Sequence, residues 1–318
     1  MKYPVSISVH NSFGWLHLLL SGNKKPLLVL TMLILSMLSA QNILAGSLNV
    51  AVTNYPLQYF AQRVGGDKIT VSFPAPTSVD PAFWRPGQGA LSVYQKADLI
   101  FINGASYEKW IRRTSLPIRK LVNTSKTFAE HYIHEEDAIV HSHGDEVPHS
   151  HGDVAFTTWL DFDQAAMQAQ AIYETLKRRQ PADTDFFTEN WSALLKDLRA
   201  LDEQAKAIVA HAPDRFLVGS HPVYQYLARR YRIPMTSLHW EPDMLPAEGD
   251  WRALQVIIDA SQPRSMLWED MPLAETMQKL KQMGLNSLVF APCANVPESG
   301  DWLAVMRQNL QNLQRAYE

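Results

Sequence analysis

The chain has 318 residues, of which 46% are hydrophobic and 10% aromatic, enough to bury a core in two domains of ordinary size. Its 29 basic and 32 acidic residues give a net charge of −3, which argues against a nucleic-acid partner held mainly by phosphate contacts. The single cysteine, Cys293, has no partner for an internal disulfide. We expect it to be buried, and a catalytic or ligand role is the alternative.

Residues 1–45 have the pattern of a targeting segment. Lys24 and Lys25 precede an uncharged run from Pro26 to Ala45, which ends on a small residue suited to cleavage. We predict a cleaved secretory signal, with a retained membrane anchor as the alternative. No cysteine lies near the predicted cleavage point, so lipid attachment there is not supported.

The next part of the chain alternates strand and helix patterns. Residues 48–53 and 69–73 alternate like strands, and a helix pattern covers 57–64 between them. The apolar run 97–104 ends in Asn-Gly and fits a buried parallel strand. This order of elements predicts an α/β domain with a parallel sheet.

A long helix is the clearest single element of the sequence. Apolar residues recur at three- and four-residue steps from about Asp185 to Ala210, with Thr184 or Asp185 as the N-terminal cap. A shorter helix pattern, 163–178, precedes it. Because strand and helix patterns resume beyond residue 214, we expect the long helix to join two lobes.

The second half repeats the strand and helix alternation of the first. Strand patterns cover 215–220, 233–239, 265–268 and 287–290, and helix patterns cover 222–231, 251–261, 273–283 and 301–317. The sequence predicts an α/β fold of two (βα) lobes with parallel sheets, bridged by one long rigid helix, with a ligand cleft between the lobes. The predicted boundaries are 1–45 for the signal peptide, 46–183 for the N-terminal lobe, 184–213 for the linking helix and 214–318 for the C-terminal lobe.

The pentapeptide His-Ser-His-Gly-Asp occurs twice, at 141–145 and 149–153, within a His-rich loop, 131–153. Imidazole is the commonest protein ligand for zinc and similar metals, and a short His-rich tract indicates metal binding. We therefore predict that the four histidines of the repeats bind metal: His141, His143, His149 and His151. A solvated polar loop with incidental histidines is the alternative.

Several motifs resemble the solute-binding proteins of zinc and manganese ABC transporters, most of all the periplasmic zinc-uptake type. They are Val-Thr-Asn-Tyr-Pro-Leu at 52–57, Lys-Ala-Asp-Leu-Ile-Phe-Ile-Asn-Gly at 96–104, Thr-Thr-Trp-Leu-Asp at 157–161 and, most specific, Ser-His-Pro-Val-Tyr-Gln-Tyr-Leu-Ala at 220–228. The resemblance covers the chain from about Leu48 to its end and implies two lobes joined by one rigid helix.

The same resemblance implies a function. It predicts a monomeric periplasmic receptor, not an enzyme, that captures a divalent metal and hands it to an ABC permease in the inner membrane. Zinc is the expected metal, and manganese or another divalent metal is the alternative.

The metal ligands are where this chain departs from the family. The family histidine of the Ser-His-Pro motif is present as His221, and we predict it to be a ligand. The two other histidine positions hold Ala82 and Thr157, and the carboxylate position holds Ala291. One retained ligand cannot hold zinc tightly, because zinc sites use three or four protein donors. For His221 alone, a cleft histidine with a satisfied hydrogen bond is the alternative.

Two groups of residues could replace the missing metal ligands. The first is the set of loop histidines, and the second is a set of side chains near predicted strand ends: Asp80, His239, Glu241, Asp243, Glu269 and Asp270. Solvated or salt-bridged carboxylates are the alternative reading of the second set. Within it, 239–241 and 268–270 are favoured because they follow extended segments.

Other functions remain open to the sequence. If the cleft is lined by Trp84, Trp159, Trp240 and Trp268 with Arg85, it could hold an organic ligand or a metal chelate. A metal-dependent hydrolase would be expected to show motifs such as His-Glu-x-x-His or Gly-x-Ser-x-Gly, and neither occurs. A periplasmic metal buffer or chaperone shares every feature of the receptor.

Overall fold

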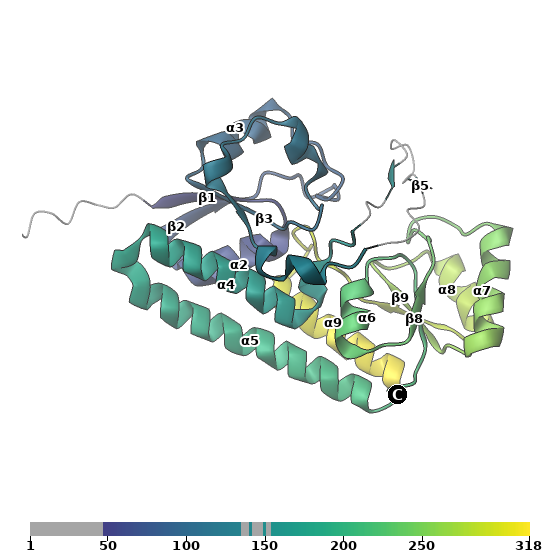
Figure 1. Cartoon of the computed structure of the whole chain (residues 1–318). Helices are drawn as coiled ribbons and strands as arrows, with labels where there is room; N and C mark the ends of the chain where they lie inside the picture. Colours follow the sequence, from purple (N-terminus) through teal and green to yellow (C-terminus); the bar gives the residue numbers. More distant parts are fainter. Residues whose placement is uncertain (1–46, 135–139, 142–148, 151–153) are drawn as a thin grey trace, which may run out of the picture. The chain divides into compact units, whose positions relative to one another are not determined.

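The computed structural model describes residues 47–134, 140–141, 149–150 and 154–318, and the part from Ser47 to Glu318 is one compact unit (Figure 1). The predicted signal peptide lies outside the described residues, as does most of the His-rich loop. Each helix in the described ranges is too short or too polar to cross a membrane.

The first lobe is built on a four-stranded parallel sheet in the order β2-β1-β3-β4. Its strands are β1 (Leu48–Val52), β2 (Ile69–Ser72), β3 (Leu99–Ile102) and β4 (Leu121–Asn123). The helices α2 (Tyr55–Gly65), α3 (Gln88–Lys96) and α4 (Phe162–Arg179) belong to the same half of the chain. The sequence predicted all of these elements except α3 and β4.

The second lobe is another four-stranded parallel sheet, in the order β10-β9-β7-β8. Its strands are β7 (Leu217–Gly219), β8 (Met235–Ser237), β9 (Ser265–Trp268) and β10 (Asn286–Val289), and its helices are α6 (Gln225–Tyr231), α7 (Glu248–Ser261) and α8 (Ala274–Gln282). Trp240, Trp251 and Trp268 pack together in its own small core. Two parallel-sheet lobes confirm the predicted fold class.

Short 3₁₀ helices complete the described connections. They are η2 (Gly66–Lys68), η3 (Lys109–Arg113), η4 (Ile118–Lys120), η5 (Lys126–His131), η6 (Thr158–Leu160) and η7 (Pro181–Asp183). Of these, η6 leads directly into α4, where the side chain of Asp161 caps the helix by accepting hydrogen bonds from the N–H groups of Asp163 and Gln164.

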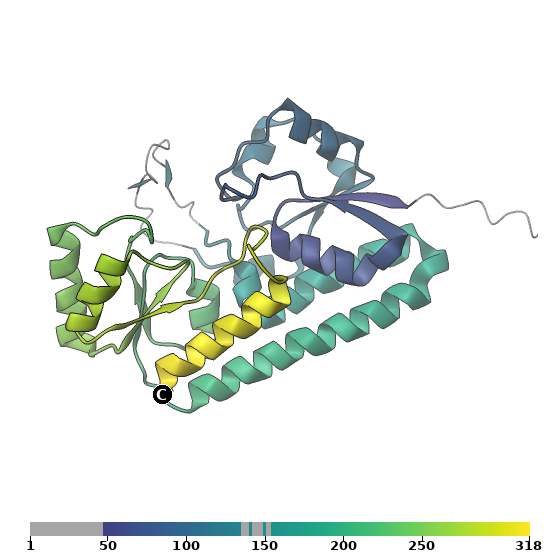
Figure 2. The same cartoon turned by 180° about the vertical axis from the view of Figure 1, so that it is seen from behind.

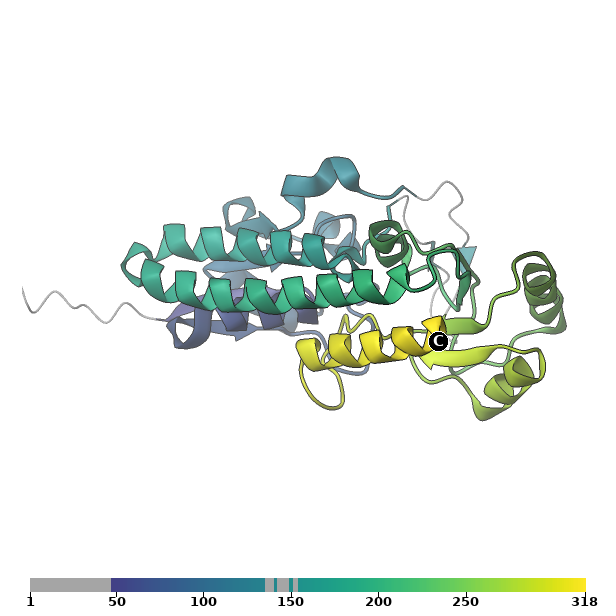
Figure 3. The same ribbon diagram turned by 90° about the horizontal axis from the view of Figure 1, so that it is seen from below.

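Two helices run between the lobes. The long helix α5 (Thr184–Ala210) has 27 residues, and the C-terminal helix α9 (Trp302–Tyr317) packs beside it (Figures 2 and 3). The first residue of α9, Trp302, lies with its ring centroid 5.0 Å from that of Phe60 in α2. The chain therefore returns to the first lobe at its end, which the sequence did not predict.

One hydrophobic core extends through both lobes. It contains Phe60 and Leu160 from the first half of the chain together with Leu217 and Tyr224 from the second. Since separating the lobes would expose this core, we infer that they are held in a fixed relation around the cleft.

The buried side chain of Glu108 links the residues that follow β1 and β3 through hydrogen bonds. Glu108 accepts hydrogen bonds from the hydroxyl of Thr53, at 2.6 Å, and from the N–H groups of Asn103 and Gly104, at 2.6 and 3.2 Å. Burial raises the pKa of Glu108 to about 7, although these hydrogen bonds oppose the shift. The side chain therefore binds its proton more tightly in the folded chain than in the unfolded one.

This raised pKa predicts a pH-dependent stability. Between pH 4.5 and about 7 the folded chain keeps a proton on Glu108 that the unfolded chain has lost. The contribution of this proton to the free energy of unfolding is therefore complete at low pH and is lost as pH rises through 7. The shift corresponds to roughly 3 kcal/mol. We expect Glu108→Gln to flatten this fall when free energies of unfolding are measured from pH 5 to 8. A variant with the slope of the wild type would contradict the assignment.

Candidate functional site

His221 lies at the carboxyl end of the second sheet. It follows β7, an inner strand between β9 and β8, and its side chain is almost fully buried. Backbone hydrogen bonding between neighbouring strands continues past the strand ends. The N–H of Ser220 donates to the carbonyl of Leu267, and the N–H of Trp240 donates to the carbonyl of Ser220, both at 2.8 Å. These two bonds bring the segments after β8 and β9 to either side of His221.

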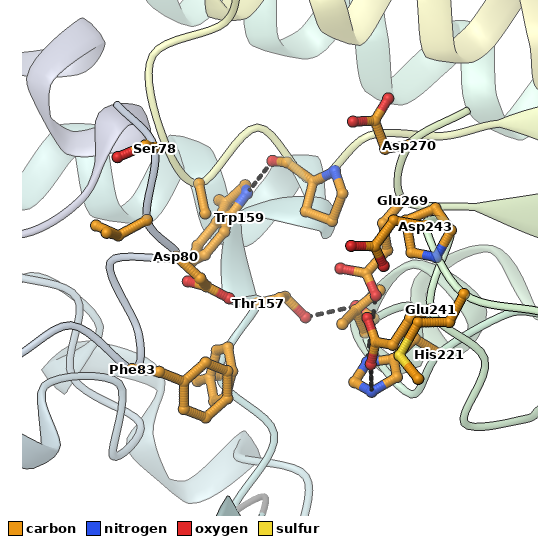
Figure 4. Close-up of a pocket in the computed structure, with 17 residues that line it drawn as sticks. Ser78, Asp80, Phe83, Thr157, Trp159, His221, Glu241, Asp243, Glu269 and Asp270 are labelled. Carbon is orange, nitrogen blue, oxygen red and sulfur yellow. Dashed lines mark hydrogen bonds and ion pairs between the residues drawn. The ribbon is translucent and has the colours of Figure 1, made fainter. Parts of the chain in front are cut away.

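Two carboxylates flank the His221 ring, one at each nitrogen. Oε1 of Glu241 lies 3.5 Å from Nε2, and Oε1 of Glu269 lies 3.2 Å from Nδ1 (Figure 4). Both carboxylates belong to the segments 239–241 and 268–270, which the sequence favoured as sources of replacement ligands. The arrangement resembles that of metal-binding imidazoles, in which a carboxylate near Nδ1 orients the ring and the lone pair of Nε2 faces the metal.

The spacing at Nε2 is compatible with a shared ion. Zinc binds nitrogen and carboxylate oxygen at about 2.0 to 2.2 Å, so two such ligands in a tetrahedral site lie roughly 3.4 Å apart. The Nε2 of His221 and Oε1 of Glu241 are 3.5 Å apart. This pair can therefore supply two of the ligands of one metal ion.

His221, Glu241 and Glu269 open onto a cavity of about 470 Å³. Figure 4 shows His221, Glu241, Asp243, Glu269 and Asp270 on one side of the cavity and Asp80 and Phe83 on the opposite side. Thr157 and Trp159 lie between them. The carboxylates that line it are Asp80, Glu241, Asp243, Glu269 and Asp270. The cleft is therefore strongly negative and favours a cation.

Of the six alternative donors named from the sequence, these five carboxylates line the cavity. His239, the sixth, is absent from the lining but packs against His221, with ring centroids 5.8 Å apart. Burial, together with the nearby His221, lowers the pKa of His239, which favours its neutral form. Among the tryptophans, Trp159 lines the cavity, whereas Trp84, Trp240, Trp268 and the neighbouring Arg85 do not.

The three positions where the family resemblance implied ligands serve other purposes here. Thr157 lines the cavity, but its hydroxyl donates a 2.6 Å hydrogen bond to the carbonyl of Val223. Ala82 is buried and lies outside the lining. Ala291 also lies outside the lining, and its backbone N–H and carbonyl form hydrogen bonds with the side chain of Asn309. Of these three positions, only Thr157 has a side chain that could bind a metal, and its hydroxyl already donates the hydrogen bond to Val223.

The stem of the His-rich loop is attached beside the cleft. His134 pairs with Val154 in an isolated antiparallel bridge, and the hydroxyl of Tyr226 in α6 accepts from the N–H of Ile133 and donates to the carbonyl of Ala155. The next residues, Phe156 and Thr157, line the cavity. Both ends of the loop therefore lie beside Tyr226, and the C-terminal end leads directly into the cavity lining.

The described residues of the loop form a short ladder. β5 (Val140–His141) pairs with β6 (His149–Ser150), and this register sets His141 opposite His149. His143 and His151 lie outside the described residues. Whether the loop histidines bind metal stays a prediction.

Cys293 is next to two lining residues, Pro292 and Ala294. Burial raises the pKa of its thiol to about 12, with Asp301 adding to the effect. Because the thiolate is the form that attacks substrates and binds metals, this cysteine is unsuited to either role at neutral pH.

Two parallel-sheet lobes border an acidic cleft that contains His221, which is the arrangement of a solute-binding protein. Residues 50–316 match the family described as zinc-uptake complex component A, periplasmic, and the chain belongs to this family.

Relatives and solved structures agree with the family. The zinc-binding lipoprotein AdcA of Streptococcus pneumoniae is 25% identical over 283 residues, which are 85% of this chain and 56% of that protein. The manganese ABC transporter substrate-binding lipoprotein PsaA of Streptococcus pneumoniae is 24% identical over 278 residues, 84% of this chain and 87% of that protein. The crystal structure of the metal-dependent lipoprotein YcdH from Bacillus subtilis superimposes with a TM-score of 0.73 at 20% identity and covers 84% of this chain and 98% of that one. This chain thus spans little more than half of the first of these relatives.

Proposed function

We propose that this chain is an extracytoplasmic receptor that captures a divalent metal and delivers it to an ABC permease in the inner membrane. Its membership of the zinc-uptake family over residues 50–316 is the observation that carries the proposal. Zinc is the first candidate and manganese the second, because the relatives named above include a zinc-binding and a manganese-transport protein.

The cleft supplies the metal site of this proposal. His221 and Glu241 are the proposed ligands, and Glu269 is a positioning residue that holds the imidazole through Nδ1. The loop histidines, His141, His143, His149 and His151, are proposed as a second and separate binding segment. This division assigns delivery to the cleft and capture to the loop.

The remaining parts of the proposal follow the family. We propose a periplasmic location after cleavage of residues 1–45, and a monomeric chain without catalytic activity. The positively charged start and the uncharged run up to Ala45 support export. The thiol of Cys293, next to the cleft, is held protonated by burial and so offers no nucleophile there.

Calorimetric titration with zinc tests the two segments separately. The chain from residue 46 onward is compared with the same chain lacking residues 141–151. We expect both to bind one zinc ion in the cleft, and the complete chain to bind additional zinc through the loop. Binding that disappears with the loop deletion would show that the cleft is not a metal site. An absence of zinc and manganese binding in both would refute the receptor proposal.

One observation favours a second candidate, a receptor of the same fold for a different solute. Only His221 remains of the ligand positions that the resemblance implied, while Ala82 and Ala291 lie outside the cavity lining. A non-metal solute would bind to the complete chain and to the loop-deleted chain equally, in the presence of EDTA. Retention of affinity in EDTA is therefore the result that would favour it.

A further inference from the structure

The cleft offers a single metal ion too few donors to enclose it. His221 Nε2 and Glu241 converge, but Glu269 approaches Nδ1, which points away from Nε2 across the ring. Across the described ranges, no three His, Cys, Asp or Glu side chains are placed to hold one ion. A zinc ion bound to the converging pair therefore keeps about two of its four positions for ligands from outside the protein.

The cavity is also larger than a metal ion with two or three bound waters. A water molecule takes up about 30 Å³, so an ion with two or three waters fills on the order of 100 Å³. The cavity has a volume of about 470 Å³, which falls in the range of about 300 to 1,000 Å³ typical of pockets for small organic molecules. There is room beside the ion for a molecule of amino-acid size.

The wall that faces His221 suits a carbon skeleton. Phe83 lines the cavity on the side of Asp80 (Figure 4), and Phe156, also a lining residue, packs against it with ring centroids 6.1 Å apart and an interplanar angle of 76°. Met244, which follows Asp243 in the chain, adds a flexible apolar side chain to the lining. A ligand that reaches from His221 to Phe83 therefore meets polar donors at one end and apolar surface at the other.

Charge limits the kind of molecule that can enter. None of the 17 lining residues is lysine or arginine, and five are carboxylates. A negative cleft attracts cations and repels polycarboxylates such as citrate. The favoured companion of the metal is thus a neutral or zwitterionic chelator, because its complex with a divalent ion stays positively charged.

We propose that the cleft takes up its metal as a mixed complex with a small zwitterionic chelator. Nε2 of His221 and Glu241 supply two ligands, and an amine- or imidazole-bearing chelator supplies the others while its carbon skeleton packs on Phe83 and Phe156. This inference rests on the proposed metal-receptor function and specifies the form in which the metal is bound.

Equilibrium dialysis with labelled zinc and labelled L-histidine tests the proposal on the chain from residue 46 onward. Free zinc is held constant, histidine is the chelator probe, and His221→Ala provides the background from the loop. We expect histidine to be retained in a one-to-one ratio with the zinc in the cleft, and zinc retention to rise at least about tenfold. No retained histidine, with zinc retention unchanged at constant free zinc, would overturn the mixed complex and leave the receptor function intact.

Variants separate the chelator wall from the metal ligands. Phe83→Ala should abolish histidine retention and leave the binding of zinc alone unchanged, whereas Glu241→Gln should weaken both. Met244→Ala repeats the test at a partly exposed residue, in case Phe83→Ala folds poorly, and Val256→Ala on the outer face of α7 is the neutral control. Equal histidine retention in all four variants would overturn the proposal. Failure of zinc to bind under any condition would refute the receptor function itself.

Discussion

Replacing His221 by alanine is expected to lower the affinity of the cleft for zinc at least about 100-fold. The loss of an outer-shell partner of a metal site already costs about 10- to 100-fold, and among the described residues His221 is the only histidine that lines the cavity. Its removal leaves Glu241 as a single donor at that point. Competition with a zinc-binding dye, carried out on the loop-deleted chain, measures the cleft alone.

Two matched variants show whether the effect belongs to this imidazole. His211→Ala, at the exposed end of α5, removes a histidine far from the cavity and should leave affinity unchanged. Glu269→Gln keeps the size of the positioning side chain and should weaken binding by less than His221→Ala does. Unaltered zinc affinity in His221→Ala would mean that the metal is not bound at this position.

The second large effect is expected in the core. Trp302 is fully buried, and its ring lies against Tyr59, Phe60 and Phe162, with centroids 5.7, 5.0 and 6.4 Å away. Trp302→Ala should lower the free energy of unfolding by about 3–5 kcal/mol, because it removes a large apolar side chain and leaves a cavity. Denaturant unfolding of the apo chain measures the change.

The conservative variant at this position shows that packing is the cause. Nε1 of Trp302 is buried with no hydrogen-bond partner in the described structure, so Trp302→Phe loses no bond and keeps most of the ring contacts. We expect it to lower the free energy of unfolding clearly less than Trp302→Ala does, because the cavity left behind is smaller. Zinc affinity should stay unchanged in both variants, since Trp302 does not line the cavity. A small effect of Trp302→Ala would show that α9 contributes little to the shared core.

Most of the fold could be predicted because its signals are local. The apolar stripe of the long helix predicted a start at about Asp185, and α5 begins at Thr184. The strand β1 was likewise predicted from its alternating pattern, and β3 from a short apolar run. The return of α9 to the first lobe could not be predicted, because the amphipathic pattern of a helix shows that one face is buried but not against which element.

The candidate site, too, could be predicted only in part from the sequence. His221 could be identified from its motif, and Glu241 and Glu269 from their places after predicted strands. That each carboxylate faces a different nitrogen of His221 depends on strand order, since β8 and β9 flank β7. The order of strands in a parallel sheet is a tertiary feature, and spacing along the chain does not encode it. Phe83 was not predicted to line the cleft for the same reason.

Anomalous X-ray diffraction at the zinc absorption edge, on crystals of the chain from residue 46 onward grown with zinc, shows directly whether the cleft binds the metal. We expect a peak within bonding distance of Nε2 of His221 and of the Glu241 carboxylate, with additional density from non-protein ligands on the side of Phe83. A peak confined to residues 141–151, with none in the cleft, would contradict this expectation.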